Sequence, residues 1–371
     1  MNKVMTDPYS PFQRQLLKLR RRYRSYLKSL PDNFYRLVGD WDFVFGKNRF
    51  LGEYFCFWLG HTLGIDDEEL LQKASLGALF GRAFVAIQDR LMDEEKTYHP
   101  ELDLLKNLFF QKFIKNFQQL LPLDHRFWIY FEKYYREYIT GNYLELERRR
   151  SGTTQFPKTA LSKIYRKTAI AKIPVAILAL KAGKEKEIQP LNRALNMAIT
   201  GIQICDDTID WEEDLANQNF TYPLILAIEL MRAEASLLLN LPLMRENIAE
   251  IFLLFGLADG LLTLSNCYLE LAKKYISHLD QSPIFSHLDF LISRHKKVCR
   301  SLSEERKKAS FCWTEPNYVK IAGSDEPILS IEKEKYLHFK EAVCPKKRHL
   351  DRQKILGRLQ DILKEAEKLP R

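Results

Sequence analysis

The chain has 371 residues, 46% of them hydrophobic and 28% charged, a balance that excludes a disordered chain and supports a sizeable buried core. Its 57 lysines and arginines against 48 aspartates and glutamates give a net charge of +9, which favours an anionic partner without choosing among phosphate, membrane surface and nucleic acid. Six scattered cysteines without a CxxC pair, and eight histidines without HExxH or HxxxH spacing, argue against a disulfide framework and a zinc site. With no signal-peptide segment in MNKVMTDPYSPFQRQ, we expect a cytoplasmic protein.

Helical periodicity dominates the chain, and because no stretch of strict alternation competes with it we predict an all-α fold. A basic amphipathic stretch, FQRQLLKLRRRYRSYLKSL, comes first. Asp66 and Glu69 then form a D-x-x-E start signal for a long amphipathic helix. Further helices are predicted at about 103–121, 124–148, 159–182, 187–214, 222–239, 243–275 and 284–308, and Pro174 predicts a kink inside one of them.

The periodicity is lost after about residue 308 and returns only in a final amphipathic helix. We therefore predict one α-helical domain over residues 1–308. Residues 309–371 are predicted to form an appendage, an irregular segment followed by the C-terminal helix.

A concentrated acidic cluster ends the helix predicted at 187–214. Asp206, Asp210 and Asp214 are spaced i, i+4 and i+8, so they share a face that runs back through Gln203 to Ile199. Like charges four residues apart cost a helix roughly 0.2–0.5 kcal/mol per pair, so a cation should neutralise them. Carboxylates on a helix suit Mg²⁺, which retains waters and bridges to substrate phosphates. A solvated acidic helix end is the alternative.

A second helix has the same design. Asp89 and Asp93 are spaced i and i+4, and their face runs back through Val85 and Gly81 along small or apolar residues. Carboxylates near a helix C-terminus oppose the helix dipole, which argues against an ordinary charged helix end. If the two helices face each other in a bundle, they enclose an apolar pocket for a hydrocarbon chain below a metal-binding rim for a pyrophosphate.

Four motifs along the chain resemble those of the class I isoprenoid synthases, which comprise the trans-prenyl diphosphate synthases and the class I terpene cyclases. Asp89-x-x-x-Asp93 resembles their DDxxD motif, with Arg90 in place of the second aspartate. QICDDTID resembles the FQxxDDxxD motif of the prenyl synthases, and Asp206, Asp210 and Asp214 also match the spacing of the cyclase triad (N/D)DxxSxxxE. YRKTAIA at 165–171 resembles the diphosphate-binding KTA segment, and NFTYPLILA at 219–227 resembles GNxTxPxxxA. The likeness covers about residues 65–275.

The resemblance implies a single helical bundle of the class I terpenoid synthase type around a central apolar cavity, with up to three Mg²⁺ ions between two carboxylate clusters and the substrate diphosphate. It implies catalytic roles for Asp89, Asp93, Asp206, Asp210 and Lys167, and metal binding by Asp89, Asp93, Asp206, Asp210 and Asp214. Substrate-binding roles fall to Arg166, Lys167, Thr168, Gln203, Val85, Gly81 and Ile199.

Departures from the family motifs leave the branch open. The GGKR-like segment, the arginine pair after DDxxD and the Gly-Lys after the second motif of the prenyl synthases do not occur, and neither does the Arg-Tyr pair of the bacterial cyclases. Our first hypothesis is a terpene synthase, a lyase acting on one prenyl diphosphate. The alternatives are a prenyltransferase that joins two substrates, by elongation or head to head, and a helical protein that binds prenyl diphosphates or membranes without catalysis.

We expect a prenyl diphosphate as the partner and no nucleic acid. The basic stretch near the N-terminus is interpreted as a surface helix with snorkelling arginine stems. Closure over bound diphosphate, or peripheral contact with a membrane that supplies the substrate, remains an alternative. The oligomeric state is also open, with a homodimer as one alternative.

Overall fold

The computed structural model describes residues 10–38, 53–93, 100–151, 161–217, 219–234, 248–249, 251–252 and 257–312. All secondary structure in this part of the chain is helical, which confirms the prediction of an all-α fold. The last described helix, α14 (Pro283–Cys312), continues four residues past the end predicted for it at 308. The rest of the predicted appendage, with its C-terminal helix, lies outside the described residues.

The chain divides into two compact units with interleaved segments, and each is described by itself. Unit 1 comprises Met1–Leu146, Tyr165–Asn196 and Ala272–Asp289, and unit 2 comprises Glu147–Ile164, Met197–Leu271 and Phe290–Arg371, in each case as far as they are described. The borders fall inside five continuous elements: α7 (Phe127–Ser151), η3 (Leu161–Ala171), α9 (Ile188–Ile209), α13 (Leu257–Tyr275) and α14. The single domain predicted at 1–308 and the central cavity stay predictions.

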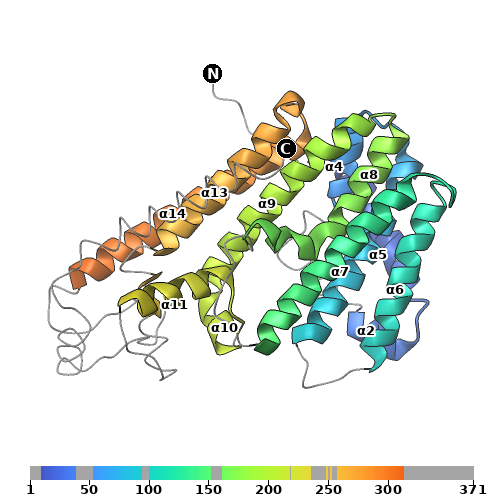
Figure 1. Ribbon diagram of the computed structural model, residues 1–371. Helices are drawn as coiled ribbons and strands as arrows, with labels where there is room; N and C mark the ends of the chain where they lie inside the picture. Colours follow the sequence, from blue (N-terminus) through green and yellow to red (C-terminus); the bar gives the residue numbers. More distant parts are fainter. Residues whose placement is uncertain are drawn as a thin grey trace. The chain divides into compact units, whose positions relative to one another are not determined.

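Unit 1 contains the helices that carry the first aspartate pair and the cationic segment. In chain order these elements are η1 (Ser10–Phe12), α1 (Gln13–Leu27), α2 (Asp32–Val38), α4 (Phe55–Leu63), α5 (Glu68–Asp93), α6 (Pro100–Gln118), α7 up to Leu146, η3 from Tyr165, α8 (Lys172–Lys181), η4 (Glu185–Glu187), the start of α9, the end of α13, η5 (Ser277–Leu279) and the start of α14. Helices α5, α6, α7 and α8 lie side by side in Figure 1. Aromatic rings pack between α5, α6 and α7. The ring centroids of Phe84 of α5 and Tyr138 of α7 lie 5.8 Å apart, and those of Phe113 of α6 and Phe131 of α7 lie 5.4 Å apart.

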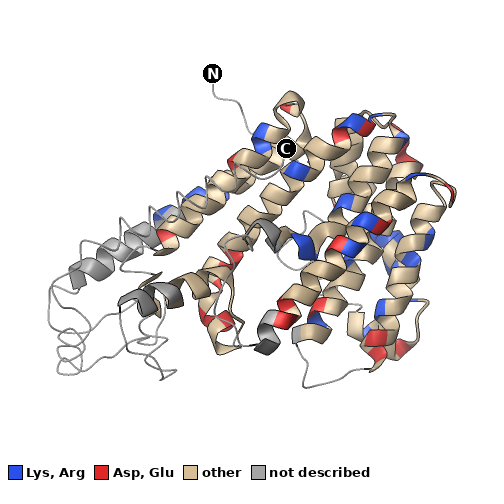
Figure 2. Ribbon diagram, viewed as in Figure 1, with Lys and Arg blue, Asp and Glu red and all other residues tan. Residues whose placement is uncertain are grey.

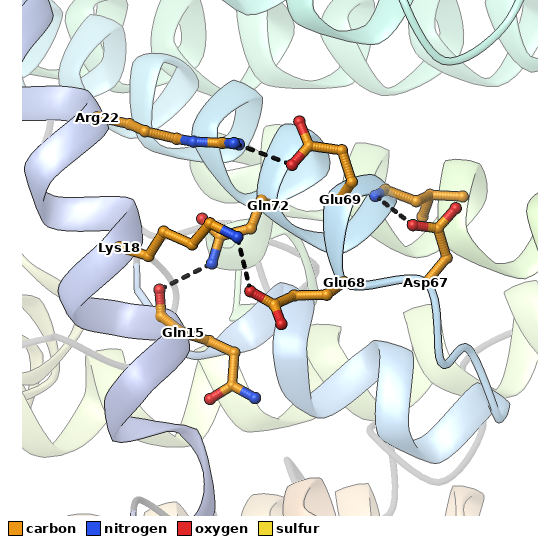
Figure 3. Close-up of polar contacts among 8 residues, drawn as sticks. Gln15, Lys18, Arg22, Asp67, Glu68, Glu69 and Gln72 are labelled. Atoms are coloured by element: carbon orange, nitrogen blue, oxygen red, sulfur yellow. Dashed lines mark hydrogen bonds and ion pairs between the residues drawn. The ribbon is translucent and has the colours of Figure 1, made fainter.

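Helix α5 is the central helix of unit 1, and its start differs by one residue from the prediction. The Asp67 carboxylate accepts a hydrogen bond from the Leu70 amide at 3.0 Å, so Asp67 rather than Asp66 caps the helix (Figure 3). Glu68–Met92 is long and apolar enough to cross a membrane, but 72% of the apolar 18-residue stretch within it is buried inside the structure. This burial is typical of a core helix.

Helix α1, the basic stretch near the N-terminus, packs against the beginning of α5. Its apolar stripe of Leu16, Leu19, Tyr23 and Leu27 is buried. Lys18 pairs with Glu68 at 2.9 Å and Arg22 pairs with Glu69 at 2.9 Å (Figure 3). These contacts agree with the interpretation as a surface helix. They also place Lys18 and Arg22 about 30 Å along α5 from Asp89, too far to cover a ligand there.

The helix predicted at 159–182 consists of two elements. Residues Leu161–Ala171 form the 3₁₀ helix η3, and the α-helix α8 begins at Lys172. Pro174 is the third residue of α8, a position in the first turn whose amide would have no partner within the helix. The predicted break therefore occurs three residues before the proline, as a change of helix type. Such a long 3₁₀ run is uncommon and requires support from its neighbours.

Unit 2 contains the end of α7, the start of η3, the second part of α9, α10 (Trp211–Ala216), α11 (Tyr222–Glu234), and the parts of α13 and α14 within its borders. Gly201 lets α9 and α13 approach closely, because a Cβ there would lie 2.8 Å from the Ser265 carbonyl oxygen. The Ser265 hydroxyl donates to the Gly201 carbonyl at 2.7 Å and lies 2.8 Å from His295 Nδ1 of α14. Since that hydroxyl has one proton, Nδ1 is the donor to Ser265. A buried polar contact thus joins the three helices.

Candidate functional site

Asp89 lies at the exposed end of α5, beside two buried groups. Its carboxylate is on the protein surface. Burial lowers the pKa of Arg82, two turns earlier on α5, and the Asp89 charge opposes that effect. Burial raises the pKa of Tyr138 on α7, and the Asp89 charge raises it further. Asp89 therefore lies where the end of α5 meets α7. Asp93 is the last residue of α5, and its side chain lies outside the described set.

The Tyr138 phenol is a polar group that sequence reasoning did not select. The residue is 1% exposed, and its hydroxyl has no hydrogen-bond partner among the described residues. Burying a hydroxyl without a hydrogen-bond partner costs free energy, so this turn of α7 is a candidate part of the site. The sequence contained one weak signal, since the spacing of Tyr134 and Tyr138 puts both on the buried face of α7.

The small and apolar residues below Asp89 are used for packing in unit 1. Val85 is buried, as expected for this face. A Cβ on Gly81 would lie 2.8 Å from the Phe113 ring of α6, so Gly81 occupies a helix–helix contact. The predicted role of Gly81 and Val85 in lining a substrate cavity stays a prediction, and the contact with Phe113 gives Gly81 an additional structural role.

The second aspartate set lies at a break between two helices of unit 2. Asp206 lies in the last turn of α9, Asp210 caps α10 with φ −93° and ψ 17°, and Asp214 lies within α10. The Asp210 amide donates to the Asp206 carbonyl at 2.9 Å, and the Asp214 amide donates to the Asp210 carbonyl at 3.0 Å. The predicted i, i+4, i+8 spacing therefore survives in the hydrogen bonding, although the helix predicted as continuous to 214 is interrupted. Figure 2 shows acidic residues gathered over this region.

The aspartates of this set differ in exposure. Asp210 is exposed, and Asp206 and Asp214 are half-buried. Asp214 Oδ1 accepts a hydrogen bond from the Asn219 side chain at 2.8 Å, which orients one carboxylate. Asp207, the neighbour of Asp206, is buried.

Two further residues selected from the sequence lie on α9. Ile199 is buried. The Gln203 side-chain amide donates to the Asp207 carboxylate one turn later in the same helix, so it orients an acidic group. Phosphate binding by Gln203 stays a prediction. Trp211, the first residue of α10, stacks on Phe252 with 5.3 Å between the ring centroids.

The cationic segment lies in η3 of unit 1. With three residues per turn, neighbouring side chains point about 120° apart, so Arg166 and Lys167 diverge. Lys167 Nζ lies 3.3 Å from a Glu145 carboxylate oxygen of α7. Arg166 Nε is buried without a hydrogen-bond partner among the described residues. The Thr168 hydroxyl donates to the Tyr165 carbonyl at 2.8 Å, so it stabilises the 3₁₀ turn.

One turn of α7 brings the cationic segment and Asp89 into the same region of unit 1. A Cβ on Gly141 would lie 2.6 Å from the Lys167 amide nitrogen and 2.7 Å from the Arg166 carbonyl carbon, so η3 crosses α7 at this glycine. Tyr138, three residues earlier, is the residue that senses the Asp89 charge. The i, i+3 spacing puts Tyr138 and Gly141 on neighbouring positions of one face. Sequence reasoning did not find Gly141.

The carboxylates selected from the sequence are ligands of the kind that Mg²⁺ takes together with waters and phosphates. In the described part of the chain, no group of three His, Cys, Asp or Glu side chains could hold a metal ion. Mg²⁺ is usually bound by one or two carboxylates together with waters and substrate phosphates. The exposed carboxylates of Asp89 and Asp210 leave room for such ligands.

The predicted site residues fall into two sets. Asp89, Asp93 and the segment of Arg166, Lys167 and Thr168 belong to unit 1, and Asp206, Asp210 and Asp214 belong to unit 2. The structure describes each set by itself. No family model, no curated protein and no solved structure matches the chain.

Proposed function

We propose that this chain is a Mg²⁺-dependent class I terpene synthase. It would ionise a prenyl diphosphate to an allylic carbocation that cyclises or rearranges, and would release pyrophosphate. One observation supports the proposal: a single turn of α7 lies against the Arg166–Lys167 backbone at Gly141 and against α5 at Tyr138, whose ring centroid lies 5.8 Å from that of Phe84, five residues before Asp89. This turn of α7 thus contacts both the helix that carries Asp89, a carboxylate suited to Mg²⁺, and the segment whose cations are suited to diphosphate. The motif resemblance supplies the substrate class.

In this proposal, Asp89 and Asp93 from α5 and Asp206, Asp210 and Asp214 from the α9–α10 break would hold Mg²⁺. The metal would withdraw charge from the leaving oxygen of the diphosphate. Lys167 and Arg166 would donate charge-assisted hydrogen bonds to phosphate oxygens. The Asn219 amide would keep the Asp214 carboxylate oriented through its 2.8 Å hydrogen bond. Buried apolar side chains such as Val85 and Ile199 would shield the cation from water.

A panel assay tests the proposal directly. The purified full chain is incubated with Mg²⁺ and prenyl diphosphates of C10 to C25, and hydrocarbon products are read by gas chromatography while released pyrophosphate is measured. We expect a terpene product from at least one substrate, and loss of that product with EDTA. Tight binding without pyrophosphate release from any substrate would favour the non-catalytic alternative.

The prenyltransferase alternative is supported by YRKTAIA and QICDDTID, both of which match prenyl-synthase motifs. Labelled isopentenyl diphosphate distinguishes the two enzymes, because only an elongating transferase would incorporate it. Condensation of two identical substrates would instead give a product with twice the carbon number. A product with the carbon number of its substrate supports the terpene synthase.

A further inference from the structure

The face of α7 under the cationic segment has three residues at helical spacing. Glu137, Gly141 and Glu145 stand at i, i+4 and i+8, so they lie along one side of α7. Gly141 lies against the backbone of residues 166 and 167. The two glutamates on either side form ion pairs with Lys172 and Lys167. The segment is thus placed on α7 by a close contact between two ion pairs.

The first ion pair is buried at its lysine: the Lys172 side chain is 5% exposed, whereas the Glu137 side chain is 20% exposed. Lys172 Nζ lies 2.9 Å and 3.0 Å from the two carboxylate oxygens of Glu137. The Tyr165 ring covers the ammonium, with 4.6 Å between Nζ and the ring centroid. Burial lowers the pKa of Lys172, and the charge of Glu137 opposes that effect. A buried pair is costly to break, because the remaining charge would have no compensation. This pair therefore holds the junction of η3 and α8 in place.

The second ion pair is open to solvent. Lys167 Nζ and Glu145 lie 3.3 Å apart, and their side chains are 32% and 15% exposed. Solvent reaches the ammonium of Lys167, unlike that of Lys172, and an ion pair that solvent reaches contributes only about 0.2–1 kcal/mol, so another anion can replace Glu145. A carboxylate oxygen at Lys167 occupies the position that a phosphate oxygen would take.

We propose that the two glutamates of α7 have opposite effects on anion binding by the Arg166–Lys167 segment. Glu137 positions the segment through Lys172, whereas Glu145 is an internal anion that a diphosphate displaces from Lys167. This inference rests on the proposed function, since it assumes that the segment binds diphosphate. Glu137 and Lys172 are positioning residues, and Glu145 sets the affinity.

Pyrophosphate binding tests the inference without any need for turnover. The full chain is titrated with sodium pyrophosphate in the presence of Mg²⁺ by isothermal titration calorimetry. Glu145→Gln should bind pyrophosphate about two- to fivefold more tightly, because Lys167 no longer has to give up its ion pair with residue 145. The double variant Glu137→Gln, Lys172→Met removes both charges of the first ion pair and should bind pyrophosphate about tenfold more weakly or worse, as when residues that support a site are removed.

Two further variants serve as controls. Glu132→Gln makes the same charge change on an exposed residue of α7 whose partner, Arg136, belongs to the same helix, and its affinity should match the wild type. Glu137→Asp keeps the charge but shortens its reach, so it tests the positioning role if the double variant does not fold. Glu145→Gln should also lower the melting temperature slightly, and a purely structural residue would not raise affinity while lowering stability.

Weaker or unchanged binding by Glu145→Gln overturns the competing role of Glu145. Wild-type affinity in both the folded double variant and Glu137→Asp overturns the positioning role of Glu137. If the wild-type protein itself binds no pyrophosphate with Mg²⁺, the proposed function fails and the inference fails with it. If the wild type binds pyrophosphate but the Glu145 and Glu137 variants do not change its affinity in opposite directions, the inference fails and the proposed function is unaffected.

Discussion

Gly141 of α7 supports the backbone of Lys167 directly: a Cβ at position 141 would lie 2.6 Å from the Lys167 amide nitrogen. Gly141→Ala must therefore push η3 away from α7, since the obstructing atoms are backbone and cannot rotate aside. Overpacking of this kind costs roughly 1–3 kcal/mol, so we expect a lower free energy of unfolding in urea and weaker pyrophosphate binding. Thr140→Ala, at the exposed neighbouring position, should stay within about 0.5 kcal/mol of the wild type.

Removal of either aspartate set should abolish turnover and leave the fold intact. Asp89→Asn and Asp206→Asn each remove a carboxylate from an exposed or half-buried position. Because Asp89 supports the charged form of buried Arg82, Asp89→Asn should also lower stability slightly. Product formation and circular dichroism are measured together, with Asp124→Asn as an exposed control. Wild-type turnover in both variants would exclude the metal-binding role.

Gly81 should behave as a packing residue towards Phe113. Gly81→Ala places a Cβ 2.8 Å from the Phe113 ring and should lower the free energy of unfolding by roughly 1–3 kcal/mol. In the double variant with Phe113→Leu, the smaller side chain leaves room for that Cβ. The double variant should therefore lose less free energy of unfolding than the two single variants lose together. Urea denaturation of the four proteins measures this coupling. Strictly additive losses would contradict the contact.

Stability should fall as the pH falls from 7 to 5, because two histidines are buried in neutral form. Burial lowers the pKa of His295 to about 4, with a contribution from Arg294, and burial lowers the pKa of His287 to about 3, against an ordinary value of 6.5. Below pH 6.5 the unfolded chain takes up protons that the folded chain does not bind. Each histidine should therefore cost roughly 2 kcal/mol of stability at pH 5 relative to pH 7.

The measurement for this prediction is urea denaturation at both pH values. His295→Gln should show a smaller loss between pH 7 and pH 5 than the wild type. His61→Gln, at an exposed histidine, should show the wild-type loss. A wild-type pH dependence in His295→Gln would mean that this histidine does not titrate as its burial requires.

Lys167 should contribute more to diphosphate binding than Arg166. Its ammonium is partly exposed and its contact with Glu145 is exchangeable. A lost charge-assisted hydrogen bond costs roughly 1.5–3 kcal/mol, so Lys167→Ala should lower kcat/KM and pyrophosphate affinity about ten- to a hundredfold. Arg166→Ala should do less. The reverse order would identify Arg166 as the cation that triggers ionisation, and near-wild-type values in both variants would place the diphosphate elsewhere.

The sequence by itself determined the helical class and the residues at the helix ends. Periodicity is a local property, so the long amphipathic run before Asp89 and the apolar stripe before Asp206 could be read without knowledge of their neighbours. The i, i+4 spacing of the aspartates likewise depends only on helix geometry. These two sets were selected for that reason, and the hydrogen bonding through Asp210 retains the spacing.

Only the tertiary structure decided how these residues are held. The contact of Gly141 with Lys167 and the pairing of Glu137 with Lys172 each join segments that are separated in the chain, and both hold residues of the 3₁₀ helix 161–171 or its junction with α8. Side-chain periodicity does not report which helix will lie opposite, and a glycine in α7 has no special local signal. Close packing and the cost of burying charge without a partner select these contacts, and both act only when the chain is folded.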